Sequence, residues 1–197
     1  MPREDGKDFD LLVVGSNSVP DRPSFSDTLS YGADKGLIQI AEHPFIESHC
    51  GMGEERLEKY IEKFDAIEGH NAQAIFRSWI THLPIVGSTF SRAGRELNEK
   101  ARETAIKYEK PYVANSYAHR IEDLGIAYNE WEGEINDRNE DTFLTDLRGR
   151  IRSGRFTTHM GYEPVVAWLG WVSTFQKGIN ENKGKTIGGK YVPSNEF

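Results

Sequence analysis

The chain has 197 residues, of which 37% are hydrophobic and 28% are charged, and its formal net charge is −7. This length suits a single domain with its own hydrophobic core. The acidic balance argues against nucleic acid as the main partner, because a phosphate backbone is bound by clustered lysines and arginines. We interpret the one local basic cluster as solvated charges around a helix end; it consists of Arg148, Arg150, Arg152 and Arg155.

The residues 1–8 are polar, are expected to be disordered, and lack the apolar stretch of a signal peptide. The longest apolar run, residues 165–172, is too short to cross a bilayer. The single cysteine, Cys50, excludes an intrachain disulfide, which fits a reducing compartment. We therefore expect a cytoplasmic protein that does not contact membranes.

Strands and helices are predicted to alternate from residue 9 onward. The apolar run 9–15 is typical of a buried parallel strand. Ser24 is expected to cap a helix that ends at Gly36, and residues 37–41 form the next predicted strand. A helix with one apolar stripe is predicted for residues 54–63.

The middle of the chain continues this alternation. A strand is predicted over residues 64–68 and a short helix over 72–79. A long helix over residues 92–109 then leads into a strand over 112–115, which Pro111 begins.

The remaining predicted elements are a strand over 125–130, a helix from an Asp141 N-cap to Gly154, a strand over 155–158 and a terminal helix over 163–176. Residues 177–197, rich in Gly, Asn and Lys, are expected to form a loosely held tail. Such alternation predicts one α/β domain over residues 9–176, built on a parallel sheet or barrel of roughly six strands.

Two of the predicted strands end in a histidine at the point where a loop begins. The first reads Ala41-Glu42-His43-Pro44, and the second, residues 111–119, ends at His119. In a barrel of alternating strands and helices, such strand ends carry ligands and catalytic groups. His43 and His119 are therefore candidate functional residues.

Five segments resemble, in order and spacing, the second half of the polymerase and histidinol phosphatase (PHP) family of metal-dependent phosphoesterases. Residues 36–45 are similar to the strand that carries the family's His-Pro ligand, and residues 113–119 to its Ser-Asp-Ala-His motif. The other similar segments are residues 64–71, 123–128 and 143–156. The resemblance extends over residues 10–158 and implies a partial or trimmed (β/α) barrel.

The chemistry of this family, as the resemblance implies it, uses divalent ions that bridge a phosphate ester and lower the pKa of the attacking water. The resemblance makes His43 and His119 ligands of Zn, Mn or Fe. Weaker candidates lie at or just beyond the same strand ends, and they are Glu42, Glu68, His70 and Asp123.

Several positions depart from the family pattern. Asn17 stands where the family has a bridging glutamate, and Tyr117 replaces the aspartate of Ser-Asp-Ala-His. The family's first two histidine-bearing strands would precede residue 10. An amide and a phenol do not neutralise a cluster of divalent cations as carboxylates do, so the pattern predicts an incomplete metal site.

Two hypotheses follow. We favour a PHP-like protein that works as a non-catalytic binding or assembly module. The alternative is a metal-dependent hydrolase that acts on a phosphoester small molecule with a reduced or partner-completed site. A barrel without its first strands would expose sheet edges, so both hypotheses predict a homo-oligomer or a partner chain that completes the barrel. Trp168 and Trp171 mark one candidate contact surface.

Overall fold

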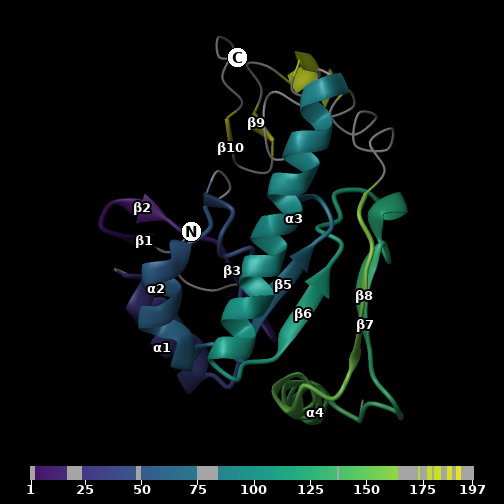
Figure 1. Ribbon diagram of the computed structural model, residues 1–197. Coiled ribbons are helices and arrows are strands. Elements are labelled where there is room, and N and C mark those ends of the chain that lie inside the picture. The colour runs from purple at the N-terminus through teal and green to yellow at the C-terminus, as the bar shows by residue number, and fades with distance from the viewer. Residues whose placement is uncertain are drawn as a thin grey trace.

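The computed structural model describes residues 3–16, 24–47, 50–74, 84–136 and 138–163, together with short pieces between 173 and 191. At its centre lies a four-stranded sheet in the order β3-β4-β5-β6 (Figure 1). These strands are β3 (Leu11–Val14), β4 (Ile38–Ala41), β5 (Ala66–Asn71) and β6 (Tyr112–Asn115). The three strands β4, β5 and β6 are parallel, so the prediction of a parallel-rich α/β sheet is confirmed.

The prediction of a buried parallel strand at residues 9–15 is wrong, because β3 runs antiparallel to β4. Leu11 pairs with Ala41 and Val14 with Ile38, and the four residues of β3 are only half buried. An aliphatic run indicates a strand but does not encode its direction. The reversal has a consequence for the site, since it puts Asp10, which precedes β3, beside the carboxyl end of β4.

A second antiparallel pair, β7 (Ala127–Glu130) and β8 (Thr157–Met160), lies beside β6 as a separate sheet. Side chains join it to β6. The Asn129 amide makes two hydrogen bonds of 2.8 Å with the backbone of Ala114. The Ser116 hydroxyl donates to the Ala127 carbonyl at 2.8 Å and accepts from its N–H at 3.2 Å. The described strands thus form an open arrangement, and the trimmed barrel stays a prediction.

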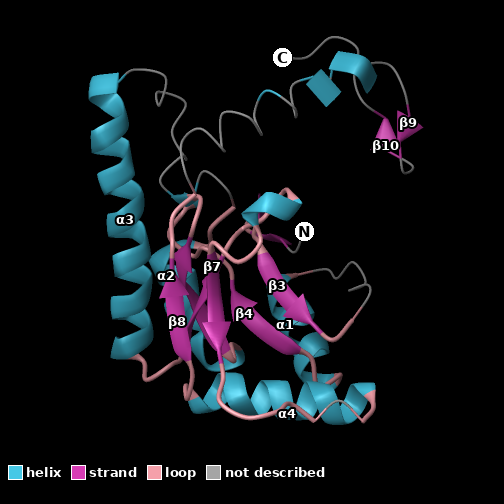
Figure 2. Cartoon of the chain, turned by 90° about the vertical axis from the view of Figure 1, so that its right-hand side faces the viewer, coloured by secondary structure: helices cyan, strands magenta, loops and turns pink. Residues whose placement is uncertain are grey.

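Helices cover both faces of the central sheet. On one face lie α1 (Phe25–Asp34), α2 (Gly53–Tyr60) with the short 3-10 helix η2 (Ile61–Lys63), and α3 (Pro84–Lys107). The helix α4 (Glu140–Ser153) covers the opposite face, where Leu147 and Ile151 pack against β4, β5 and β6. Figure 2 shows α4 crossing below the strands. The chain therefore stacks its elements as helix, sheet and helix layers.

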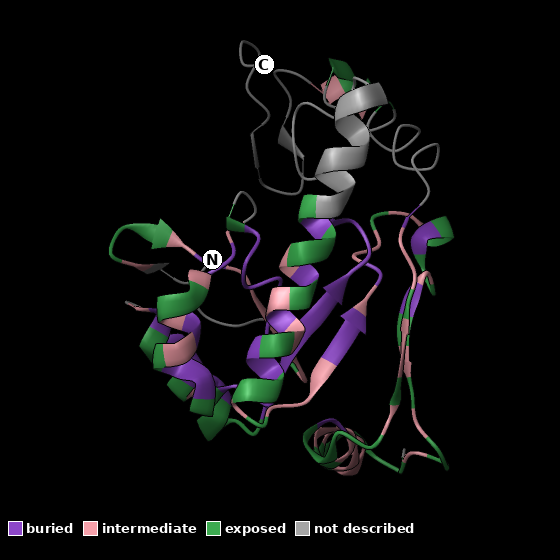
Figure 3. Ribbon diagram, viewed as in Figure 1, coloured by how far each residue is buried: buried purple, intermediate pink, exposed green. Residues whose placement is uncertain are grey.

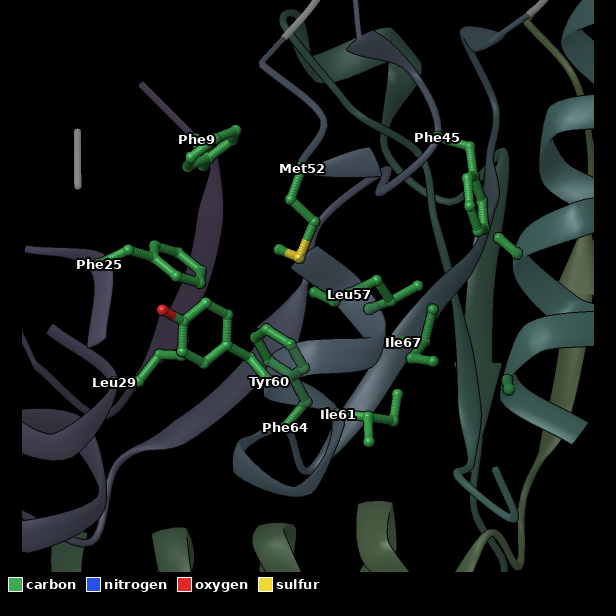
Figure 4. Packing of buried hydrophobic residues seen from close by; sticks show 13 residues of the cluster. Phe9, Phe25, Leu29, Phe45, Met52, Leu57, Tyr60, Ile61, Phe64 and Ile67 are labelled. Carbon is green, nitrogen blue, oxygen red and sulfur yellow. The ribbon is translucent and has the colours of Figure 1, made fainter. Parts of the chain in front are cut away.

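The larger hydrophobic core lies between α1, α2, α3 and the sheet (Figure 4). Phe25 joins two edge-on aromatic pairs there, with ring centroids 5.8 Å from Phe9 and 5.3 Å from Tyr60. Every residue of β5 is buried, as Figure 3 shows. Because this central strand is packed on both faces, the groups at its carboxyl end are held on a rigid support.

The ends of the helices follow their capping residues. The Ser24 hydroxyl accepts from the Asp27 N–H at 3.1 Å, which confirms the predicted start of α1. At α4 the predicted cap, Asp141, is wrong. Asn139 has the extended backbone that an N-cap needs, and its side chain accepts from the Thr142 N–H at 2.9 Å. Gly154, with φ +62°, ends this helix as predicted.

Asp65 fixes α4 to the base of the sheet. This residue precedes β5 and is 3% exposed, and one of its carboxylate oxygens accepts from Arg148 at 3.0 Å and from Arg152. The other oxygen accepts from the Gln39 N–H at 2.9 Å. Arg150 pairs with Asp146 within α4 at 3.2 Å. Arg148 and Arg152 of the basic cluster therefore hold the helix against the sheet, whereas Arg150 pairs within the helix.

Further elements lie at the two ends of the chain. Residues 1–8, for which the sequence predicts disorder, include the hairpin strands β1 (Arg3–Glu4) and β2 (Lys7–Asp8). Near the other end, β9 (Thr186–Ile187) pairs with β10 (Lys190–Tyr191). Most of the predicted helices at 72–79 and 163–176, including Trp168 and Trp171, lies outside the described residues. No helix in the described ranges is long and apolar enough to span a bilayer.

Candidate functional site

The candidate residues gather at the carboxyl ends of β4, β5 and β6, the edge of the sheet that points away from α4 (Figure 1). Glu42 and His43 follow β4, and Glu68 and His70 belong to β5. His119 and Asp123 follow β6, with Asp123 ending the 3-10 helix η4 (Ile121–Asp123). The residues therefore lie at the strand ends where the sequence predicts them. The contacts of each residue decide what it can do there.

His43 is 2% exposed and sits between two carboxylates. Its Nε2 lies 3.6 Å from Asp10 Oδ2 and 3.8 Å from Glu42 Oε1. Its backbone has φ 25°, an uncommon conformation for a residue other than glycine. The sequence pattern misses Asp10, because only the antiparallel direction of β3 brings that residue to this edge.

Glu68 links the strained turn at His43 to the central strand. One of its carboxylate oxygens accepts from the backbone N–H of His43, and the other accepts from Asn71 Nδ2 at 3.1 Å. The side chain is buried, and hydrogen bonds to a buried carboxylate are among the stronger ones in proteins. Glu68 thus serves to hold the His43 backbone in place.

His70 is tied into a different cluster. Its Nε2 lies 2.7 Å from the carbonyl oxygen of Gly161, and Asn98 of α3 approaches Nδ1 at 3.4 Å. The ring packs edge-on against Tyr162, with centroids 4.7 Å apart. A carbonyl can only accept, so the Nε2 hydrogen donates to it. Burial lowers the pKa of His70, which keeps the ring neutral.

Tyr117 contacts the rings of both leading candidates. Its ring centroid lies 5.4 Å from that of His43 and 4.9 Å from that of His119, edge-on in each case. Tyr117 also has a left-handed backbone, with φ 51°. His119 itself is exposed. The two histidines are thus connected through a phenol, at the position where the resembling motif has an aspartate.

Asp123 belongs to a buried charge cluster that the sequence analysis misses. It accepts from the backbone N–H groups of His119 at 3.3 Å and Arg120 at 3.1 Å, and it pairs with the Arg120 guanidinium. Arg120 also binds Glu163 at 3.0 Å. Asp123 and Glu163 are each 1% exposed. Burial by itself would raise the pKa of Asp123. The hydrogen bonds from Arg120 and His119 outweigh burial, so the pKa of Asp123 is lowered.

Glu163 is the carboxyl of this cluster whose pKa is raised. Burial and then the neighbouring Asp123 carboxylate raise its pKa to about 6. A carboxyl with a folded-state pKa above its ordinary 4.5 stabilises the fold fully below pH 4.5, and that contribution is lost as the pH rises through about 6. We expect a loss of about 1–2 kcal/mol over this window.

Glu163→Gln tests this titration, because an amide keeps the shape and stays neutral. Urea unfolding at several pH values from 4.5 to neutral is expected to show a flatter pH dependence for this variant than for the wild type. The matched control, Glu122→Gln, changes an exposed carboxylate on η4. It is expected to leave the slope of unfolding free energy against pH unchanged. Equal slopes in all three proteins would contradict the assignment.

The candidate ligands as they stand do not fit a metal site. Within the described ranges, no group of three or more His, Cys, Asp or Glu side chains could hold a metal ion. Glu68, His70 and Asp123 are engaged in contacts that build the edge. Among the described residues, Asp10 and Glu42 bring two carboxylates to His43, fewer than a pair of divalent ions needs.

Comparison with known proteins supports the resemblance seen in the sequence. A family model described as PHP-associated matches residues 95–151, a stretch that begins in α3 and ends in α4. The resemblance to the PHP family is thereby confirmed over residues 95–151, which are similar to a C-terminal segment of PHP proteins. Neither the search of curated proteins nor the search of solved structures gave a match.

Proposed function

We propose that this chain is a PHP-like binding or assembly module that does not hydrolyse phosphoesters. The observation that carries the proposal is the use of three weaker candidate ligands as structural links. Glu68 holds the His43 turn, His70 holds the segment at Gly161, and Asp123 holds the His119 loop. A residue whose polar atoms already fix the backbone would have to give up those bonds in order to coordinate a metal.

The electrostatics support the same function. Two-metal hydrolysis needs several carboxylates that converge on the ions and on the substrate oxygens. At the position of Tyr117 the chain offers a phenol next to both histidines. A neutral phenol supplies no charge to offset a pair of divalent cations.

Metal content and hydrolysis test the proposal directly. The chain is purified without an affinity tag or chelator, analysed by elemental mass spectrometry, and assayed on bis(p-nitrophenyl) phosphate with added Mn²⁺ or Zn²⁺. We expect far less than one metal per chain and no hydrolysis beyond that of the double variant His43→Ala, His119→Ala. Stoichiometric metal that the double variant loses would contradict the proposal.

Assembly is the second part of the proposal. Among the described strands, β3 lies at the edge of the central sheet, and its four aliphatic residues are half exposed. Edge strands of this composition are prone to pair with another chain. Sedimentation velocity on the same untagged preparation is expected to show concentration-dependent self-association. A monomer at every concentration would contradict homo-oligomer formation and direct the search to a different partner chain.

One observation favours a second candidate function, a metal-dependent phosphoesterase with a reduced site. The carboxylates of Asp10 and Glu42 lie 3.6 and 3.8 Å from His43 Nε2. Two ligands about 2.1 Å from a tetrahedral ion are about 3.4 Å apart, so a small movement of Asp10 and Glu42 would match that spacing. The metal analysis above separates the two functions.

A further inference from the structure

We propose that the edge strand β3 binds the β3 strand of a second copy of this chain, antiparallel and about a twofold axis that passes beside Leu12. Figure 2 shows β3 at the margin of the central sheet. The inference rests on the proposed function, in which the chain is an assembly module. It goes further by naming the partner, the direction of pairing and the register, so that two central sheets join into one continuous sheet.

The hydrogen bonds of β4 show which backbone groups of β3 are already used. The Gln39 carbonyl accepts from the Asp65 N–H at 2.8 Å, and the Gln39 N–H donates to the Asp65 carboxylate at 2.9 Å. The backbone of Gln39 therefore faces β5. Because backbone direction alternates along a strand, the residues on either side of Gln39 face β3 instead. Their partners in the ladder are Leu12 and Val14, which use their N–H and C=O groups on β4.

Leu11 and Val13 consequently direct their N–H and C=O groups to the outer edge. The neighbouring Asp10 follows the same alternation, since its N–H donates at 3.0 Å to the Cys50 carbonyl in the segment between β4 and α2. The described residues provide no hydrogen-bond partner for the outward groups of Leu11 and Val13. Such an edge is a template for another strand, and β3 contains no lysine, proline or bulge that would block one.

A second β3 uses these groups best when it runs antiparallel with Leu12 opposite Leu12. Leu11 of each copy then exchanges hydrogen bonds with Val13 of the other copy. Charge also favours this direction. Parallel pairing in register would place the two Asp10 carboxylates on adjacent strands about 5 Å apart, whereas antiparallel pairing separates them by more than about 10 Å. The half-exposed aliphatic side chains of β3 would be covered in the dimer.

Leu12→Cys tests the register in an untagged Cys50→Ser background, which lacks the chain's single cysteine. The opposed Leu12 pair is not hydrogen-bonded, so its Cα atoms would lie about 4.5 Å apart, a separation that suits a disulfide. After mild oxidation with diamide, we expect this variant to shift from monomer to covalent dimer on a non-reducing gel. The matched control, Val14→Cys, lies on the same face of β3. Its two sulfurs would be more than about 10 Å apart, so it is expected to stay monomeric.

Val13→Pro tests the edge by a second route. Proline removes the outward N–H of Val13 and leaves the bonds of Leu12 and Val14 to β4 in place. We expect self-association in sedimentation velocity to be at least about tenfold weaker than in the wild type. This comparison decides the question should Leu12→Cys fail to fold.

Two results would overturn the β3 pairing. One is equal crosslinking of Leu12→Cys and Val14→Cys, and the other is undiminished self-association of a folded Val13→Pro chain. In either case, self-association of the wild type would still support an assembly module that uses a different surface. The metal and hydrolysis assays test the absence of catalysis independently of these variants.

Discussion

Gly161→Ala is expected to destabilise the fold by about 2–3 kcal/mol. A Cβ atom at this position would lie 2.1 Å from the carbonyl oxygen of Ile126, far inside van der Waals contact. The obstacle is backbone at the start of the β7–β8 pair, so it cannot turn away as a side-chain tip could. The clash is relieved only if the backbone at Gly161 moves away from Ile126. This movement would weaken the hydrogen bond from His70 to the Gly161 carbonyl.

The matched control is Gly149→Ala. Gly149 is exposed in the interior of α4, and a Cβ there would meet nothing within 4 Å. Alanine at such a site is expected to stabilise the fold by about 0.5–1 kcal/mol, because glycine loses more backbone entropy in a helix. Urea unfolding measures both variants. A change in unfolding free energy of the same sign for the two would contradict the close approach at Gly161.

The sequence predicts the local elements of this fold well, because their signals are carried by a few neighbouring residues. Ser24 begins α1 and Gly154 ends α4 through hydrogen bonds and backbone angles that those residue types favour. The choice between Asn139 and Asp141 as the cap of α4 depends on which residue has extended backbone, and both residue types cap helices equally well. The direction of β3 likewise depends on pairing with β4, which an apolar run does not specify.

The candidate site is predicted in position but not in role. His43, His70 and His119 reach the expected sheet edge because each follows or ends a parallel strand. What each one does there is set by partners from distant parts of the chain, such as Gly161 for His70 and Asp10 for His43. Neither partner carries a motif. A buried acid after β8, Glu163, gives no periodic or spacing signal at all.

Asp65→Asn is expected to destabilise the protein by about 2–3 kcal/mol, because it breaks the buried link between the sheet and α4. The Asp65 side chain is 1% exposed and faces Arg148 and Arg152, which are 22% and 58% exposed. An amide can still accept from the Gln39 N–H, but it cannot balance two guanidinium groups. The partial exposure of the arginines limits the loss, since water replaces part of the lost interaction.

A second aspartate in the same region isolates the effect of burial. Asp146 pairs with Arg150 at 3.2 Å, but its side chain is 32% exposed. Asp146→Asn is therefore expected to cost less than about 1 kcal/mol. Added salt should weaken the Asp146 pair more than the Asp65 pair, because solvent ions screen exposed charges first. Equal losses of unfolding free energy for the two variants in urea titrations would show that burial of Asp65 does not anchor α4, and that the apolar contacts of Leu147 and Ile151 hold the helix instead.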